Sequence, residues 1–393
     1  INKKITQLSV TVAMLMAGGT AQAASWKAGD WDLGLGGNIN AHYSITGCSN
    51  SDISSGGTTL AGLACAGSTD EHGSLTDAHT IQNGLLPASL NFSAKTNQDG
   101  WDVSANINVY YDINSQANHP SGSDALAFST VDARQVYMTF GKKESGEFKF
   151  GRDFGLFGFD AVIADMSLVG VGANFLAANM GHTSLGGLGY GYVYTDRLAQ
   201  MNYTTADMGG LKITGGVFQP NDGNGSTSAG DIGIHAKASF TQGPLTASAS
   251  FLTQGVVASG TSQDVSGFDV FVKYNLGEID LAGYLFDAEG VSSLALGGLV
   301  LPGFSGTGTP EETNGYMLQA TMKTSKQLKL GINISHSEQE KVTIVENDRL
   351  TLGAYYSLTK SLTLLGEFTS AESKLAGGSD ENTTINFGAF LGF

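Results

Sequence analysis

Hydrophobic and polar residues alternate with a period of two along most of the chain. In residues 31–43, the odd positions are mostly apolar, whereas the even positions carry polar residues or glycine. The same alternation recurs at 86–94 and 101–111, on either side of the short turn 97–100. Successive side chains of a strand point to opposite faces, so this period predicts strands with two chemically different faces.

Sixteen segments of this kind can be counted, and each is predicted to be a strand. They are residues 31–43, 86–94, 101–111, 135–140, 147–152, 198–204, 211–218, 232–240, 245–253, 268–274, 279–287, 316–323, 328–335, 350–358, 362–370 and 383–393. An even number of antiparallel strands is expected when one chain closes its own transmembrane barrel. The predicted fold class is therefore all-β, a transmembrane antiparallel β-barrel of 16 strands.

The connections between these segments alternate between two length classes. The short ones are 97–100, 142–146, 206–210, 242–244, 275–277, 325–327 and 359–361; the long ones are 44–80, 114–130, 153–191, 219–230, 255–265, 288–313, 336–348 and 372–382. Outer-membrane barrels have short turns on the periplasmic rim and longer loops on the extracellular rim. A soluble β-sandwich need not sort its connections by parity, and a solenoid would repeat at a fixed period. The two length classes therefore favour a barrel.

The first residues have the features of an export signal. Lys3 and Lys4 precede an apolar run at 8–17, which is followed by the small-residue site 21–23. This order predicts a signal peptide over residues 1–23 and a single barrel domain over 24–393. The apolar run is too short to cross a bilayer as a helix, and no later stretch approaches the roughly 20 apolar residues that a spanning helix needs. Any membrane insertion must therefore use strands.

Composition and charge agree with a barrel in lipid. Glycine accounts for 55 of the 393 residues, about twice its usual share, and only 6 prolines occur. The formal charge of −16 becomes −18 when Lys3 and Lys4 are removed with the signal, because 18 basic residues then face 36 acidic ones. This excess of acid makes nucleic acid an unfavourable partner. It also favours cations in a channel, although charges outside a narrowing are screened within about 8 Å.

The only two cysteines, Cys48 and Cys65, lie in one glycine- and serine-rich segment. A disulfide that closes this loop is the favoured interpretation, since an exported protein meets oxidising conditions. Such a bridge would stabilise the loop by about 3 kcal/mol on the chain-entropy estimate. Metal binding by two cysteines without a local ligand pair is the weaker alternative.

Catalytic and cofactor sites have little support in the sequence. The seven histidines are scattered without a pair at helical spacing, so no metal site or cofactor is predicted. A calcium site at 221–225 remains an alternative to a plain turn. A serine or aspartate near a histidine at the rim would be needed for hydrolysis, and no such motif stands out. The chain is predicted not to be an enzyme.

Two neighbouring runs and the C-terminus resemble a known family. Residues 134–140 read Arg-Gln-Val-Tyr-Met-Thr-Phe, residues 146–152 read Gly-Glu-Phe-Lys-Phe-Gly-Arg, and the chain ends at Phe393. Together with the strand pattern, they resemble the trimeric general porins of Gram-negative bacteria over nearly the whole mature chain. The resemblance implies a homotrimer in the outer membrane, in contact with lipid and lipopolysaccharide. It also implies that the terminal aromatic residue is read by the assembly machinery.

By this resemblance, the fifth strand leads into a loop that folds inward and narrows the pore. The equivalent segment here is about 153–191. Asp160 and Asp165 lie in runs that resemble the acidic stretch of that loop, and Asp165 is the first choice for the acidic side of the constriction. Many members carry a second acid four positions later, where this chain has Val169. That departure weakens the expected negative edge.

The basic side of the constriction is expected on the barrel wall. Arg134 is the best candidate by resemblance, although it shares the parity of apolar neighbours such as Val136. Lys149 alternates with phenylalanines and should point into the lumen. Arg152 has the parity of those phenylalanines, so it is expected either at the constriction or as an anchor for the loop or a neighbouring subunit.

A barrel of 16 strands is wide enough to leave an aqueous channel. The expected function is therefore passive diffusion of small hydrophilic solutes and ions, with a transverse field at the narrowing that orders polar solutes. Two alternatives stay open: a porin selective for a sugar or organic acid, and a non-conducting barrel used as an adhesin or anchor.

Overall fold

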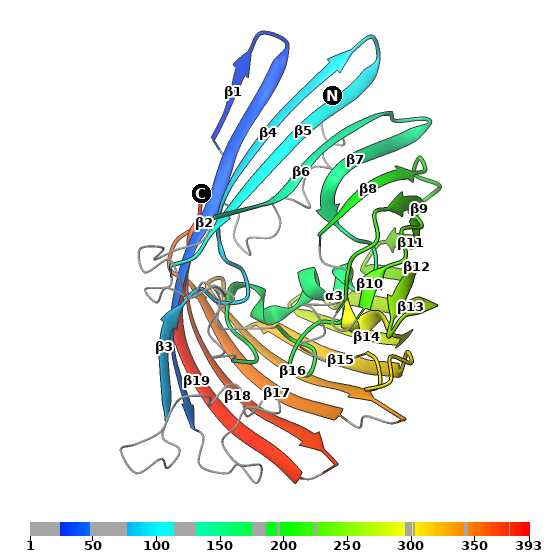
Figure 1. Cartoon of the computed structure of the whole chain (residues 1–393). Coiled ribbons are helices and arrows are strands. Elements are labelled where there is room, and N and C mark those ends of the chain that lie inside the picture. Colours follow the sequence, from blue (N-terminus) through cyan, green and yellow to red (C-terminus); the bar gives the residue numbers. More distant parts are fainter. Residues whose placement is uncertain are drawn as a thin grey trace.

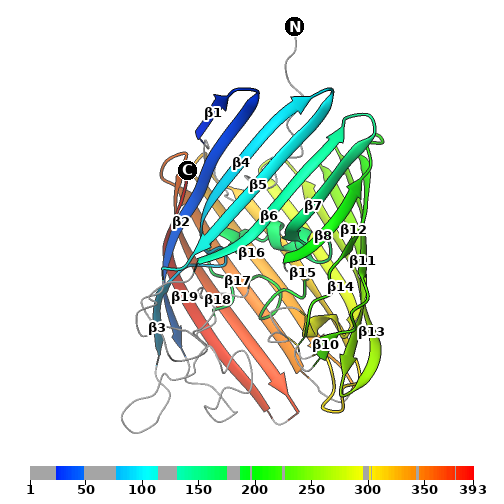
Figure 2. The ribbon, with the colours of Figure 1, turned by 45° about the horizontal axis from the view of Figure 1, so that its top comes forward.

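The computed structural model describes most of residues 24–393. The described ranges are 24–47, 77–113, 131–174, 186–194, 197–223, 226–294, 301, 303–341, 345–376 and 378–393. Their strands form one antiparallel sheet that closes into a barrel around an internal segment (Figure 1, Figure 2). Within these ranges, no helix is long and apolar enough to cross a membrane. The predicted signal peptide 1–23 and both Cys48 and Cys65 lie outside the described residues.

In the described ranges, nineteen strand elements build sixteen strands of the barrel. They are β1 (Ala24–Ala28), β2 (Trp31–Gly47), β3 (Ala78–Gln82), β4 (Ala88–Gln98), β5 (Trp101–Tyr111), β6 (Val131–Lys142), β7 (Gly146–Phe154), β8 (Arg197–Thr204), β9 (Leu211–Phe218), β10 (Ser226–Ser228), β11 (Gly233–Gln242), β12 (Leu245–Ala258), β13 (Thr261–Asn275), β14 (Ile279–Glu289), β15 (Glu312–Lys323), β16 (Leu328–Gln339), β17 (Val345–Ser357), β18 (Leu362–Leu375) and β19 (Gly378–Gly392). The helical turns α3 (Phe159–Ala164), η1 (Met166–Val169) and η2 (Val291–Ser293) lie in connections.

Three of the sixteen strands consist of two elements each. β3 and β4 follow one another along β2, and β10 and β11 do the same along β12. β1 and β19 lie end to end along the other side of β2, which closes the barrel. At the junction, Gly37 N donates to Phe393 O at 2.8 Å, and Phe393 N donates to Gly37 O at 3.0 Å. The predicted sixteen-stranded antiparallel barrel is thus confirmed.

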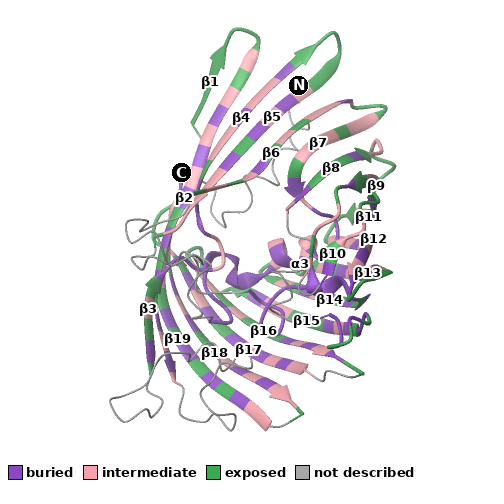
Figure 3. Ribbon diagram, viewed as in Figure 1, coloured by how far each residue is buried: buried purple, intermediate pink, exposed green. Residues whose placement is uncertain are grey.

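The two faces of each strand differ as the alternation predicted. Outward side chains such as Leu318 and Phe387 are more than half exposed, as a surface in contact with lipid requires. Inward side chains are largely polar and bond to each other, as where Ser44 Oγ donates to Asn386 Oδ1 at 3.0 Å. Figure 3 shows the resulting alternation of buried and exposed positions along the strands.

Several strands are longer than predicted at the rim that carries the long connections. The predicted loop 255–265 is wrong, because β12 and β13 pair up to Ala258 and Thr261. Only Ser259 and Gly260 turn the chain, with φ of 49° and 78°. Positive φ at both central residues fits the twist of a two-residue hairpin. Residues 255–258 and 261–265 therefore continue the two strands.

The lumen has a dry half and a polar half. Over β12–β15, many inward side chains are apolar and buried, although polar ones such as Ser250 and Asp269 lie among them. The apolar ones are Leu252, Val256, Val265, Phe271, Tyr284, Phe286 and Met317. They form one cluster with Phe157, Leu188 and Tyr192 of the segment between β7 and β8. Over β2–β8, the buried inward residues are instead asparagine, glutamine, serine and threonine, together with His42 and Asp153. Water can therefore be accommodated beside β2–β8, whereas the opposite side is packed.

Candidate functional site

The segment between β7 and β8, here called the inner loop, runs inside the barrel. Its described parts are 155–174 and 186–194, and Figure 1 shows α3 within the ring of strands. Gly158 has a φ of 73°, which lets the chain turn sharply inward. Its N–H donates to the Asp269 carboxylate on the inner wall of β13. The described residues 155–174 and 186–194 therefore lie on the inner side of the barrel wall.

Asp160 fastens the start of the inner loop to the wall. Its carboxylate accepts from Lys237 Nζ on β11 at 3.0 and 3.2 Å, and from Ser248 Oγ on β12 at 2.5 Å. The next turn is held by Gln319 on β15, whose Nε2 donates to Ala164 O at 2.9 Å. A predicted pore acid is therefore paired with a cation that the sequence did not single out.

Asp165 is buried in the inner loop. Its Oδ1 accepts from Ser167 N and its Oδ2 from the Tyr192 hydroxyl, both at 2.8 Å. Burial raises the pKa of its carboxyl above the usual range, and the Arg349 guanidinium acts in the opposite direction. Val169, where an acid was expected in many family members, packs with Tyr355 and other buried residues of the wall.

Arg349 on β17 holds the far part of the inner loop. Its guanidinium donates to the carbonyl oxygens of Gly186 and Gly187, and to Asn333 Oδ1 at 2.8 Å. A Cβ on Gly187 would lie 2.2 Å from the Asp165 carboxylate, so this close approach requires glycine. The sequence signal for Arg349 was a basic residue at a position that alternates with the outward-facing residues of its strand. This signal was missed.

Glu367 on β18 provides the matching anionic anchor. It accepts from Val171 N at 2.8 Å and Gly172 N at 2.9 Å, and also from the Tyr355 hydroxyl at 2.7 Å. Asn386 Nδ2 on β19 donates to the same carboxylate at 3.1 Å. Four donors from three elements thus fix the inner loop against the wall.

Arg134 lies on the inner wall because β6 contains a bulge. Asn108 of β5 pairs with Gln135, yet Tyr110 pairs with Asp132, so two residues of β6 stand opposite one of β5. Such an insertion changes the direction of the following side chains. The Arg134 guanidinium lies 5.0 Å from the Tyr110 ring and its Nε lies 2.9 Å from Asp132 Oδ2. The bulge therefore explains why Arg134 faces the lumen, although it alternates in step with the outward-facing Val136.

Arg197, at the start of β8, joins the same group. Its Nη2 lies 3.8 Å from Asp132 Oδ2, and its guanidinium is 6.0 Å from the Phe154 ring. Two guanidinium groups thus share one carboxylate on the polar side of the lumen. Arg197 lies directly after a long connection, and no sequence motif marks it.

Lys149 and Arg152 lie on opposite faces of β7. Lys149 Nζ donates to Asp153 Oδ2 at 2.6 Å on the inner face, as its parity predicted. Arg152 is exposed on the outer face and pairs with Val136, which is 45% exposed. The structure therefore brings Arg134 and Lys149 to the inner wall, places Asp160 and Asp165 in the inner loop, and leaves Arg152 outside.

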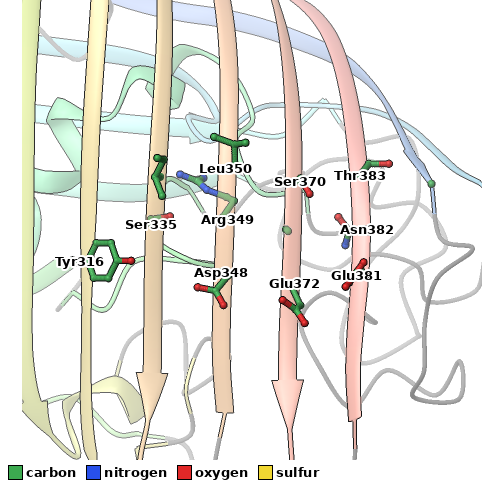
Figure 4. Close-up of a pocket in the computed structure, with 13 residues that line it drawn as sticks. Tyr316, Ser335, Asp348, Arg349, Leu350, Ser370, Glu372, Glu381, Asn382 and Thr383 are labelled. Carbon is green, nitrogen blue, oxygen red and sulfur yellow. The ribbon is translucent and has the colours of Figure 1, made fainter.

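Many of the acids lie on the outer face near the rim with the long connections. Figure 4 shows a pocket there, with Asp348, Glu372 and Glu381 beside Tyr316 on neighbouring strands. Asp348 accepts from Lys374 Nζ at 3.1 Å in the same region. Part of the negative charge of the chain therefore lies on the outer face of the barrel and not in the lumen.

Comparisons with known proteins agree with this architecture. Residues 9–376 match the family model described as Gram-negative porin. The anion-selective porin from Comamonas acidovorans is 16% identical, with a TM-score of 0.64 and coverage of 92% of this chain and 100% of that one. The channel DcaP of Acinetobacter baumannii is 13% identical, with a TM-score of 0.68 and coverage of 94% and 100%. OmpT of Vibrio cholerae in its trimer form is 12% identical, with a TM-score of 0.55 and coverage of 92% and 99%. No curated protein sequence matches the chain.

Proposed function

The chain belongs to the Gram-negative porin family, and from this premise we propose that solutes cross through the polar half of its lumen, beside β2–β8. As a porin, it is an outer-membrane channel for passive diffusion of small hydrophilic solutes. The observation that carries the proposed path is the separation of the lumen into a largely polar wall and a wall that a buried apolar cluster covers. Hydrophilic solutes keep hydrogen-bonding partners along the first wall and would lose them along the second.

The inner loop acts as the constriction in this proposal. It occupies the side of β11–β18 through Asp160, Arg349 and Glu367, so the free cross-section is limited to the side of Arg134 and Arg197. A narrow passage between fixed charges orients polar solutes and sets the size limit.

The charges at this passage support a mild preference for anions. Asp160 is paired with Lys237 and Asp153 with Lys149, and the guanidinium groups of Arg134 and Arg197 both lie within 4 Å of the Asp132 carboxylate. Two guanidinium groups therefore lie beside one carboxylate on this side of the lumen, and Asp348, Glu372 and Glu381 lie away from them on the outer face. Local charge at the narrowing acts more strongly than distant charge, which salt screens.

Liposome swelling tests the diffusion function. Vesicles that contain the purified protein are placed in iso-osmotic solutions of uncharged sugars of increasing size. The proposal predicts rapid swelling with small sugars and a steady decline with size. Vesicles that contain correctly folded protein but do not swell with any sugar would favour the adhesin or anchor alternative, and fast entry of one large sugar alone would favour a substrate-selective porin.

We also propose a homotrimer with its contact on the wall of β7–β9. β7, β8 and β9 have 9, 8 and 8 residues, at or below the 9–11 residues that a tilted strand needs to cross the hydrocarbon. Arg152 on this face would cost about 2–4 kcal/mol in the middle of lipid. A neighbouring copy over this wall removes both problems, and the remaining outer surface then contacts lipid and lipopolysaccharide.

The size of the detergent complex tests the trimer. Light scattering should give three chains per particle, and Arg152→Glu should lower that number, while Lys374→Glu on the opposite outer wall should not. A particle of one chain in the unmodified protein under mild detergent would contradict the proposal.

A further inference from the structure

The described residues of the connection between β14 and β15 are largely buried, although they lie on the rim that carries the extracellular loops. Val291, Ser292 and Ser293 have no exposed surface, and Leu294 is nearly buried. Residues 290–310 contain no charged side chain. Loops that extend into water are normally polar and exposed. This connection is therefore packed against protein.

The surface that it packs against is the inner wall of the barrel. Val291, Leu294 and Phe304 belong to the same apolar cluster as Val265 of β13 and Phe286 of β14, both of which point inward. Gly290 has a φ of 73°, and a Cβ at this position would lie 2.5 Å from Val265 Cγ1. The chain thus turns into the lumen directly after β14.

Polar contacts fix both ends of the connection. Gln339, an inward residue near the end of β16, accepts from Gly303 N at 2.7 Å and donates to the Glu311 carboxylate. Gly290 N donates to Glu311 O at 3.0 Å, and Gln263 of β13 donates to Gly308 O at 2.6 Å. The described parts of the connection are therefore held at defined positions over β13–β16.

We infer that the described parts of this connection, residues 290–294 and 303–311, form a second fixed narrowing of the pore, at its extracellular mouth above the dry half of the lumen. This inference rests on the proposed diffusion function. The second loop shares one apolar cluster with the inner loop, so both cover the same wall. Solutes then enter only along the opposite side, toward Arg134 and Arg197. Size selection begins at the mouth and continues at the inner loop.

Thiol labelling tests the position of the second loop independently of conduction. Cys48 and Cys65 are first replaced by serine. Val265→Cys is then compared with Thr139→Cys, which points inward from β6 and is half-buried. A charged, water-soluble thiol reagent should modify Thr139→Cys readily. Val265→Cys should react slower by roughly an order of magnitude or more, because its labelling waits for local opening.

Loop replacement tests the effect on permeation. In one variant, an Asn-Gly turn joins Gly290 directly to Glu311, which the backbone hydrogen bond between them allows. Its conductance should rise by roughly a factor of two, because conductance follows the open cross-section of a wet pore, and larger sugars should enter vesicles. Gln339→Ala should change both quantities in the same direction but by less.

Two results would overturn the inference. The first is an equal labelling rate of Val265→Cys and Thr139→Cys. This test does not need the shortened variant, so it remains valid if that variant does not fold. The second is a folded, inserted turn variant with the conductance and size limit of the parent. Failure of the parent itself to conduct would instead refute the proposed function, while protection of Val265→Cys would still show where the loop lies.

Discussion

Arg134 and Arg197 share the carboxylate of Asp132 on the polar side of the lumen, and this group should set the sign of ion selectivity. Arg134→Gln removes one of the two cations and should shift the zero-current potential in a salt gradient toward cation preference. Arg134→Lys keeps the charge and should largely keep the potential. Lys374→Gln, on the outer face, should have no effect. An unchanged potential in Arg134→Gln would remove this group from the permeation path.

Glu367 accepts two backbone N–H groups of the inner loop in a fully buried position. Glu367→Gln replaces one acceptor oxygen by a donor and should cost about 1–3 kcal/mol, the usual penalty of leaving buried partners unsatisfied. The free energy of unfolding in urea and detergent measures this, and open-channel noise should rise as the loop loosens. Glu372→Gln on the outer face of the same strand should change stability by less than about 0.5 kcal/mol. An equal change in the free energy of unfolding for Glu367→Gln and Glu372→Gln would argue against Glu367 as an anchor of the inner loop.

Single residues were the hardest features to predict from the sequence. The parity of Lys149 was sufficient to place it inside, whereas Arg134 needed the bulge in β6, which no pattern in the sequence announces. Arg349 and Glu367 interact with the inner loop across more than 150 residues of chain. Such contacts depend on closure of the barrel, so the sequence could indicate only that these charges point inward.

At the scale of elements, the hairpin between β12 and β13 depends on its two-residue turn. Gly260 has a φ of 78° and open space around its Cβ position. Gly260→Ala should therefore destabilise the barrel by about 1–2 kcal/mol through backbone conformation alone. Gly215→Ala, which also meets open space but has no positive φ, is the matched control and should be close to neutral. Urea unfolding compares them, and equal stability of the two variants would contradict the turn assignment.

Strand positions followed from the alternation, but strand ends did not. Inside the membrane, lipid on one face and water or loop on the other enforce the period of two. Above the membrane that contrast ends, and glycine-rich stretches such as 255–265 can pair as strand or form a loop with little change in pattern. The segments β3 and β10 were missed for the same reason, whereas β1 was missed on the opposite rim, beside the short turns.

At the scale of the whole molecule, the number of strands and their closure could be predicted from alternation and from the two length classes of connections. The division of the lumen could not. It arises because the inner loop and residues 290–311 meet the inward side chains of β12–β15 in one apolar cluster. In the sequence, the inward apolar residues of β12–β15 cannot be told from the outward ones, because both faces of these strands carry apolar residues. Only the folded barrel shows which wall is covered.

Diffusion through this porin requires that the interior of the barrel is a wet and continuous path across the membrane. Single-channel recording of the purified protein in planar bilayers under a salt gradient tests it most directly. We expect stable steps with a linear current–voltage relation and a zero-current potential on the side of anion preference. A protein that is folded and inserted, yet passes no current at any voltage, would contradict it.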